Sequence, residues 1–144
     1  MANCKKNPQN NLANIFAKIY KLKNLDFSEY IYDMPTAMVA ADIVIGRAGA
    51  SSCNEIAVAG VPCILIPSPN VTANHQEKNA RVLSGQGAAV LLLEKDCSER
   101  ALYHAVEDLL REPKRRENMI RALKDMAVPD AGEKIYVTLR ALMK

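Results

Sequence analysis

The 144-residue sequence contains no tryptophan, and its aromatic content is only 5%. The net charge of +3 is too small to form the basic face that nucleic-acid binding needs, so no nucleic-acid partner is expected. The longest apolar runs, at 37–41, 43–45 and 88–93, fall far short of the roughly 20 residues of a membrane-spanning helix. No apolar segment follows the first charged residues, so no secretory signal is expected either. The remaining composition, 49% hydrophobic and 24% charged, is that of an ordinary globular domain.

Motifs for metal, redox and phosphate-loop chemistry are also missing. The four cysteines, at positions 4, 53, 63 and 97, form no CxxC pair. Cys53 and Cys63 lie in apolar segments, which favours buried free thiols in a reducing compartment over disulfides. His75 and His104 fall in separate predicted helices and have no metal-ligand spacing to a cysteine. The sequence also has no Asp-x-Asp pair, no P-loop and no GxGxxG motif. For these reasons neither a metal nor a cofactor is expected.

Short apolar runs alternate with helical patterns along most of the sequence. Strands are predicted near 27–31, 42–46, 62–66 and 88–93. Helices are predicted at 8–23, 34–41, 52–59, 74–84, 98–111, 113–126 and 131–143. Uninterrupted apolar strands between helices are typical of a parallel sheet that is covered on both faces. The expected fold class is therefore α/β, a doubly wound, Rossmann-like single domain over residues 1–144.

Several residues have the character of helix ends. Gly60 and Gly85 are predicted to close their helices, the latter in the left-handed conformation that glycine adopts readily. Ser98 can cap the helix at 98–111, and Pro113 can open the next one. Asp130 with Glu133 has the spacing of a capping box before the last helix.

The segment from Gly46 to Glu55 joins a predicted strand to a predicted helix. Its small residues let a ligand approach the backbone, and the helix start offers free N–H groups to a phosphate. Glu55, just inside the helix, can accept hydrogen bonds from two neighbouring ribose hydroxyls. A plain capping box of Ser52 and Glu55 explains the same residues, and the two interpretations are compatible.

Two further segments combine a strand end with polar or aromatic residues. Residues 67–80 form a proline-containing loop and a helix start with Gln76, whose amide can donate to and accept from sugar hydroxyls. The simpler alternative, which the residues alone favour, is an Asn74 cap with Glu77 on a solvated face. Residues 30–35 offer a backbone edge that can recognise a base, although an aromatic-flanked strand end is usually packing.

The positions of these segments point to one edge of the predicted sheet. Doubly wound sheets bind ligands beyond the carboxyl ends of their strands. The predicted ends are Ile31, Gly46, Ile66 and Leu93, and the unusual residues gather at three of these four positions. This grouping is the strongest indication of a binding site that the residues give without reference to other proteins.

Read in order, the segments resemble the C-terminal domain of the MurG family of N-acetylglucosaminyltransferases, over about residues 28–143. Seven matching stretches occur with the right gaps: Tyr30-Ile31-Tyr32-Asp33-Met34, Ala41-Asp42-Ile43-Val44-Ile45, Arg47-Ala48-Gly49-Ala50, Asn54-Glu55-Ile56-Ala57, Gly60-Val61-Pro62, Asn74-His75-Gln76-Glu77-Lys78-Asn79-Ala80 and Gly87-Ala88-Ala89. The resemblance implies a GT-B glycosyltransferase, in which two Rossmann-like domains face each other and the C-terminal one holds the donor.

The resemblance also implies roles for individual residues. Ile31 would recognise uracil through its backbone, Glu55 would hold the ribose, and Gln76 would contact the N-acetylglucosamine hydroxyls. Arg47 looks like the family's basic residue near the donor. The diphosphate and sugar would be lined by Ala50, Ser51, Ser52, Cys53 and Asn54.

The implied reaction is transfer of N-acetylglucosamine from its UDP sugar to undecaprenyl-pyrophosphoryl-muramyl-pentapeptide. This is the lipid I to lipid II step of peptidoglycan synthesis, with inversion and without a required metal. The enzyme would be cytoplasmic and peripheral at the inner face of the plasma membrane.

The sequence has no counterpart of the family's N-terminal acceptor domain. This chain alone is therefore expected to contain no catalytic residue, to bind donor weakly and to be inactive. It can be part of a truncated or split transferase, or a separate donor-binding subunit whose partner supplies the acceptor half. The remaining alternative is a nucleotide-binding module without a transferase role, against which the presence of both Glu55 and Gln76 speaks.

Overall fold

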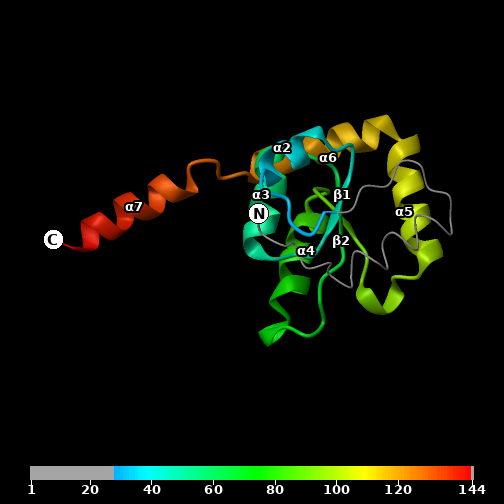
Figure 1. The fold of residues 1–144 in the computed structure, drawn as a ribbon, viewed down its shortest axis with the longest axis horizontal. Helices are drawn as coiled ribbons and strands as arrows, with labels where there is room; N and C mark the ends of the chain where they lie inside the picture. Colours follow the sequence, from blue (N-terminus) through cyan, green and yellow to red (C-terminus); the bar gives the residue numbers. More distant parts are fainter. Residues whose placement is uncertain (1–27, 144) are drawn as a thin grey trace, which may run out of the picture. The chain divides into compact units, whose positions relative to one another are not determined.

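The computed structural model describes residues 28–143, and the chain divides into two units, 1–34 and 35–144 (Figure 1). The second unit holds the sheet and most of the helices. In chain order the elements are α2 (Met34–Ala40), β1 (Val44–Gly46), α3 (Ala50–Ala59), β2 (Cys63–Leu65), η1 (Thr72–Asn74), α4 (His75–Gly85), β3 (Val90–Leu91), η2 (Glu94–Asp96), α5 (Glu99–Arg111), α6 (Pro113–Met126) and α7 (Ala131–Leu142).

The three strands form one parallel sheet in the order β1-β2-β3. Ile64 of β2 lies opposite Ile45 on one side and Val90 on the other. Backbone hydrogen bonds extend the pairing just past the strand ends: Ile66 N donates to Gly46 O at 2.9 Å. Three of the predicted strands and the α/β fold class are thereby confirmed.

The strand predicted near 27–31 was wrong for the residues that the structure describes. Residues 28–33 are irregular, and the Ser28 hydroxyl donates to Tyr30 O at 2.7 Å within a local bend. Tyr30 and Tyr32 are exposed, with their rings edge to face and 4.9 Å between centroids. Apolar residues form a strand only where a neighbouring strand pairs with them, and no strand between residues 28 and 143 pairs with these. The helix predicted at 8–23 lies outside the described residues.

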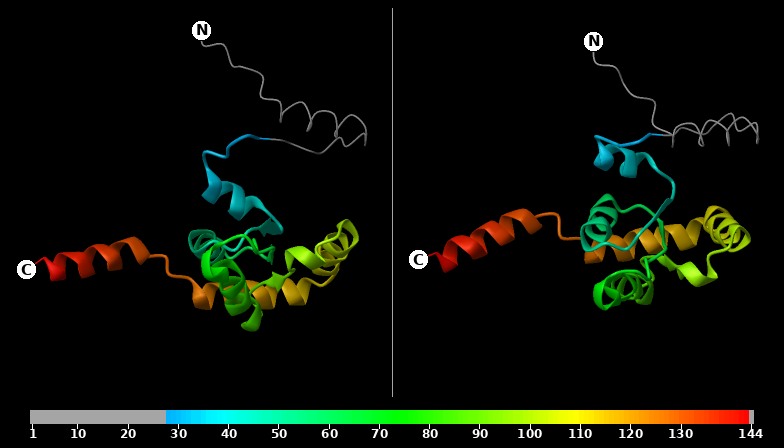
Figure 2. Two further views of the ribbon diagram at one scale, coloured as in Figure 1. Left: turned by 90° about the horizontal axis from the view of Figure 1, so that it is seen from below. Right: turned by 60° about the horizontal axis from the view of Figure 1, so that its bottom comes forward.

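The hydrophobic core surrounds β2, whose three residues are all fully buried. Ile56 of α3, Leu83 of α4 and Leu123 of α6 pack into the same cluster, together with Leu109 of α5. Figure 2 shows from two further directions how these four helices surround the strands. Burial of each large side chain contributes roughly 1.5–3 kcal/mol, so the middle strand and its covering helices hold the carboxyl edge of the sheet in place.

Most predicted helix ends are confirmed, with two exceptions. Gly60 ends α3 at φ 63°, the Ser98 hydroxyl accepts from Ala101 N at 3.1 Å, and Pro113 opens α6. Gly85 was the wrong glycine for the left-handed conformation, because Gly85 is the last residue of α4 and Gly87 takes the positive φ of 71°. Asp130 is the N-cap residue of α7, but the predicted capping box does not form, because the Asp130 side chain makes no bond to the helix backbone and pairs with Lys134 Nζ at 2.9 Å.

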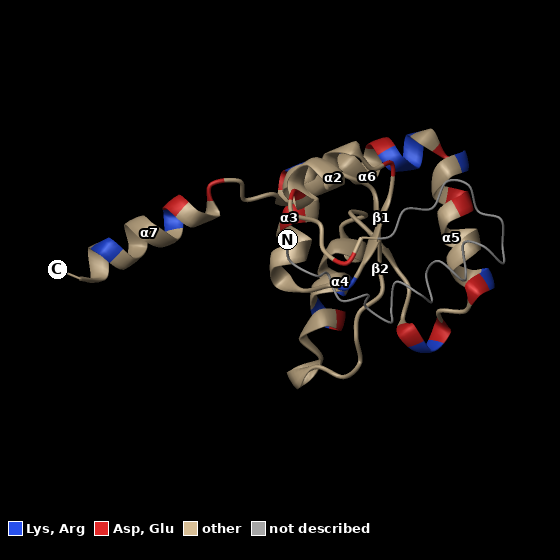
Figure 3. Ribbon diagram, in the orientation of Figure 1, with Lys and Arg blue, Asp and Glu red and all other residues tan. Residues whose placement is uncertain are grey.

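Charged residues of both signs lie along α5 and α6 (Figure 3). Ion pairs one turn apart, such as Arg111 Nη2 to Glu107 Oε1 at 2.7 Å, link several of them. α7 has no buried residue among those described, and Tyr136, Leu139 and Leu142 are exposed on it. No helix within residues 28–143 combines the length and apolar character needed to span a bilayer.

Candidate functional site

Arg47 follows β1 directly and bridges the carboxyl ends of all three strands. Its Nη1 donates to Ile66 O, just after β2, at 3.1 Å. The same nitrogen forms an ion pair with Glu94, just after β3. Both side chains are about half exposed, at 54% and 43%. The predicted basic residue therefore lies at the edge where parallel sheets bind ligands.

The start of α3 presents backbone N–H groups without acceptors. Its N-cap is Gly49, which offers no side chain, and the first helical bond runs from Cys53 N to Gly49 O at 2.9 Å. The amides of residues 50–52 precede that bond and have no acceptor within the helix. The proposed capping box of Ser52 with Glu55 is wrong, because Ser52 is already the third residue of the helix.

The next two residues of α3 turn their side chains elsewhere. Cys53 is only 7% exposed within the core, and burial raises the pKa of its thiol. Asn54 Oδ1 accepts from Val128 N, after α6, at 3.4 Å. A ligand at the start of α3 would therefore meet the exposed Ala50 and Ser51 rather than the side chains of Cys53 and Asn54.

Glu55 is exposed on α3. Its carboxylate has no hydrogen bond or ion pair to any residue that the structure describes. An ionised carboxylate accepts hydrogen bonds only, which matches the two donors of a ribose diol. The side chain is thus available to a ligand and holds no part of the described fold together.

Gln76 lies in the first turn of α4 and is half-buried. Its Oε1 accepts from Ser68 N at 2.9 Å, which fastens the loop after β2 to α4. Because a backbone N–H can only donate, the amide orientation is fixed, and Nε2 is the group left for a ligand. The prediction that this amide would both donate to and accept from a sugar did not anticipate this bond.

A second amide of α4 braces the turn after β1. Asn79 Nδ2 donates to Ala48 O at 3.1 Å, and Ala48 itself is fully buried. This contact connects α4 to the residues that precede α3. Sequence reasoning placed Asn79 in a matching motif but gave it no role, because nothing local indicates a partner 31 positions away.

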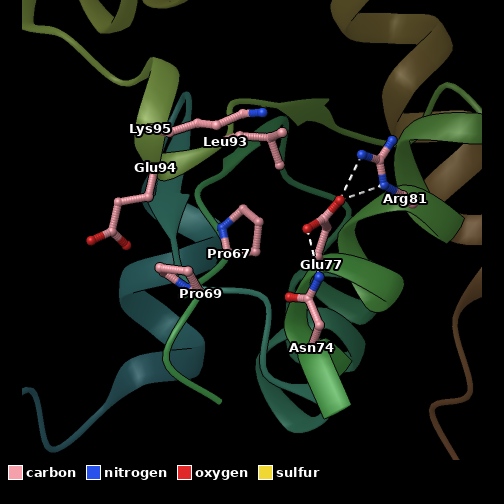
Figure 4. A pocket seen from close by; sticks show the side chains of 8 residues that line it. All are labelled: Pro67, Pro69, Asn74, Glu77, Arg81, Leu93, Glu94 and Lys95. Carbon is pink, nitrogen blue, oxygen red and sulfur yellow. Dashed lines mark hydrogen bonds and ion pairs between the residues drawn. The ribbon is translucent and has the colours of Figure 1, made fainter. Parts of the chain in front are cut away.

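A hollow of about 420 Å³ lies between the loop after β2, α4 and η2 (Figure 4). In it, Glu77 accepts from Asn74 Nδ2 at 2.7 Å and from Arg81 Nε at 2.8 Å. Both hydrogen bonds lower the pKa of Glu77, and the bond from Asn74 has the larger effect. Asn74 is the N-cap residue of α4 and Glu77 is the third helical residue, as the simpler alternative predicted, but the Asn74 side chain binds Glu77 and not the helix backbone.

Ala73 and Asn74 both have left-handed backbone angles, with φ of 53° and 52°. Such angles cost a residue other than glycine roughly 1–2 kcal/mol. The loop that brings Gln76 to the edge of the sheet thus contains local backbone strain.

Ile31 is exposed in the first unit, and its role with the base remains a prediction.

Comparison with known proteins gives consistent results. The sequence model of the glycosyltransferase family 28 C-terminal domain matches residues 2–135. A relative from Acetivibrio thermocellus is 45% identical over 132 residues, which are 90% of this chain and 36% of the relative. One from Oenococcus oeni is 47% identical over 110 residues, 76% of this chain and 30% of the relative. Both are named UDP-N-acetylglucosamine–N-acetylmuramyl-(pentapeptide) pyrophosphoryl-undecaprenol N-acetylglucosamine transferase.

Solved structures agree with this family. The crystal structure of Acinetobacter baumannii MurG superposes with a TM-score of 0.76 at 26% identity, covering 90% of this chain and 38% of that one. A glycotransferase of kitacinnamycin shares the fold, with a TM-score of 0.53 at 19% identity over 84% of this chain and 36% of that one. The chain spans about a third of the length of the curated relatives that it matches. This chain belongs to the glycosyltransferase family 28 C-terminal domains, the family of the MurG transferases.

Proposed function

We propose that this chain binds UDP-N-acetylglucosamine as the donor half of a MurG-type transferase. The observation that carries the proposal is the group of unengaged polar groups beside the carboxyl ends of β1 and β2. It comprises the free amides at the start of α3, the unpaired Glu55 carboxylate and the Gln76 Nε2. A nucleotide sugar needs these partners, since it carries an anionic diphosphate, a ribose diol and sugar hydroxyls.

Each group has a role that its chemistry supports. The amides of Ala50, Ser51 and Ser52 bind a phosphate at the positive end of the helix dipole, and Arg47 supplies a full positive charge nearby. Glu55 accepts from the ribose hydroxyls. Cys53 and Asn54 adjoin this site without offering it a free side chain, because the Cys53 side chain is buried and the Asn54 side chain accepts from Val128 N.

Gln76 donates from Nε2 to a sugar hydroxyl, while its Oε1 stays with Ser68. Ile31 recognises uracil through its backbone N–H and C=O, so its side chain matters little. In this assignment the side-chain amide of Gln76 selects the sugar, and the backbone of Ile31 selects the base.

The complete transferase would move N-acetylglucosamine from this donor to the undecaprenyl-pyrophosphoryl-muramyl-pentapeptide acceptor, forming lipid II. The acceptor would be held by a domain other than the family 28 C-terminal domain that this chain matches. Because that acceptor is lipid-linked, the working enzyme would be cytoplasmic and peripheral at the inner face of the plasma membrane. The two-thirds of the relatives' length that this chain does not match leaves room for such a domain.

The test is a titration of the ¹⁵N-labelled chain with UDP-N-acetylglucosamine, followed by amide chemical shifts. We expect the shifts to concentrate at residues 47–55 and at the Gln76 side chain, with α7 unaffected. UDP should reproduce the changes at 47–55 but not those at Gln76, because it lacks the sugar. An absence of saturable shifts, or shifts confined to α5 and α6, would reject donor binding at this edge.

A further inference from the structure

We propose that Glu94 is a positioning residue for Arg47, which it holds in the orientation that binds the donor diphosphate. The inference rests on the proposed function. Glu94 is the first residue of η2 and comes from a segment to which the sequence motifs assign nothing. Its carboxylate nevertheless meets the guanidinium of Arg47 across the full width of the sheet.

The hydrogen bonds of Arg47 leave one side of its guanidinium free. Nη1 carries two hydrogens, and it has two acceptors, Ile66 O at 3.1 Å and the Glu94 carboxylate. The remaining three N–H groups, on Nη2 and Nε, have no hydrogen bond within the described residues. Arginine binds phosphates through paired N–H groups in a fixed plane. One nitrogen thus anchors the group while the others remain available to a phosphate.

Both anchors belong to hydrogen-bonded parts of the chain. Ile66 follows the fully buried β2, and its own N–H bonds to Gly46 O at 2.9 Å. Glu94 begins a short 3-10 helix in which Cys97 N donates to Glu94 O at 3.2 Å. Without a partner, a half-exposed arginine samples many rotamers on its flexible stem, and each must be given up when a ligand binds. The Glu94 contact removes that freedom beforehand.

Glu94 also carries a negative charge, which by itself repels a diphosphate. This opposing effect is small at a half-exposed site, because water and salt screen it. Figure 4 shows the Glu94 side chain pointing away from Glu77 and Arg81, so these two residues do not engage it. If Glu94 positions Arg47, removal of the carboxylate weakens diphosphate binding; if Glu94 mainly repels the ligand, removal strengthens it. A binding measurement therefore separates the two effects.

The experiment compares the affinities of the parent chain and of five variants for UDP and for uridine, measured by calorimetry. Glu94→Ala should weaken UDP binding by about 3- to 10-fold and leave uridine binding unchanged. Glu94→Gln keeps an acceptor for Nη1 and should bind UDP within about twofold of the parent chain. In an Arg47→Ala background, Glu94→Ala should have no further effect. Glu107→Ala removes a carboxylate that pairs with Arg111 on α5, and serves as the matched control.

Each result is decisive. If Glu94→Ala and Glu94→Gln both strengthen UDP binding, Glu94 repels the ligand and positions nothing. If UDP binding is unchanged, or falls together with uridine binding, the positioning role is rejected while the proposed function stands. If the parent chain binds neither UDP nor uridine, the proposed function itself fails, and the role of Glu94 fails with it.

Discussion

The side-chain amide of Asn79 donates to the carbonyl oxygen of Ala48 at 3.1 Å and so joins α4 to the turn before α3. The two residues lie 31 positions apart in the chain. The turn they fix begins with Arg47 and ends at the first free amides of α3. The geometry of the candidate phosphate site thus depends on a residue outside it.

Asn79→Asp should destabilise the chain more than Asn79→Ala does. Alanine removes one hydrogen bond and leaves a part-buried carbonyl unpaired, at a cost of about 1–2 kcal/mol. Aspartate has the same shape but turns a second acceptor toward Ala48 O, which adds repulsion. Urea unfolding of the three proteins measures the difference. Equal stabilities for all three would show that the contact holds nothing in place.

Substitutions at Gln76 should separate its two roles. Gln76→Glu retains an acceptor for Ser68 N but loses the amide donor, whereas Gln76→Ala loses both. Hydrogen exchange at the Ser68 amide should stay slow in Gln76→Glu and become fast in Gln76→Ala. The preference for UDP-N-acetylglucosamine over its galactosamine analogue should narrow in both, by an amount on the order of 1–3 kcal/mol, with UDP binding retained in Gln76→Glu. An unchanged sugar preference would return Gln76 to a purely structural role.

Ala73→Gly should stabilise the chain. Ala73 has a φ of 53°, where an L-residue with a Cβ is strained and glycine is not. Relief of about 1–2 kcal/mol exceeds the roughly 0.4–1 kcal/mol that glycine adds to the entropy of the unfolded chain. A net gain of about 0.5–1 kcal/mol should appear as a higher urea midpoint. A lower midpoint would mean that the left-handed angle at Ala73 is not what strains this loop.

The stability of the fold should fall at alkaline pH through Cys63. Burial, and next the nearby Cys53 thiol, raise the pKa of Cys63 to about 12. The unfolded thiol ionises near its usual range of about 8.5, so the folded state binds the extra proton above that pH. Stability is therefore complete below about pH 8.5 and declines by at most about 1.4 kcal/mol per pH unit up to pH 12. Cys63→Ala, compared by urea unfolding at pH 8 and 10, should show a shallower decline, and an identical slope would contradict the assignment.

The helices and three strands could be predicted because their signals are local. Ser98, Pro113 and Gly60 mark helix ends through their own side chains or backbone freedom. Gly87, and not Gly85, takes the left-handed conformation after α4. There two hydrogen bonds close the helix end, from Ala88 N to Leu83 O and from Gly87 N to Ser84 O. The strand prediction at residues 28–31 was wrong because a strand needs a pairing partner, and the local sequence pattern does not show whether one is present.

The sequence indicates candidate ligand-binding residues, whose roles stay predictions, but it does not indicate the contacts that support them. Arg47, Glu55 and Gln76 carry unusual chemistry at strand and helix ends, and that is visible in a sequence. The contact of Asn54 with Val128 spans 74 positions, and that of Arg47 with Glu94 spans 47. The identity of one glutamate or asparagine does not indicate which distant residue it will contact. These contacts can therefore be found only in the folded chain.

Calorimetric titration of Glu55→Ala with UDP-N-acetylglucosamine, beside a melting curve, tests donor binding at this edge most directly. A charge-assisted hydrogen bond of about 1.5–3 kcal/mol corresponds to a loss of affinity of roughly 10- to 150-fold. The melting temperature should not change, because Glu55 has no partner among the described residues. Glu99→Ala, which removes an exposed carboxylate from the first turn of α5, should leave the affinity unchanged. A Glu55→Ala variant that binds the donor normally yet melts early would contradict the account and make Glu55 a structural residue.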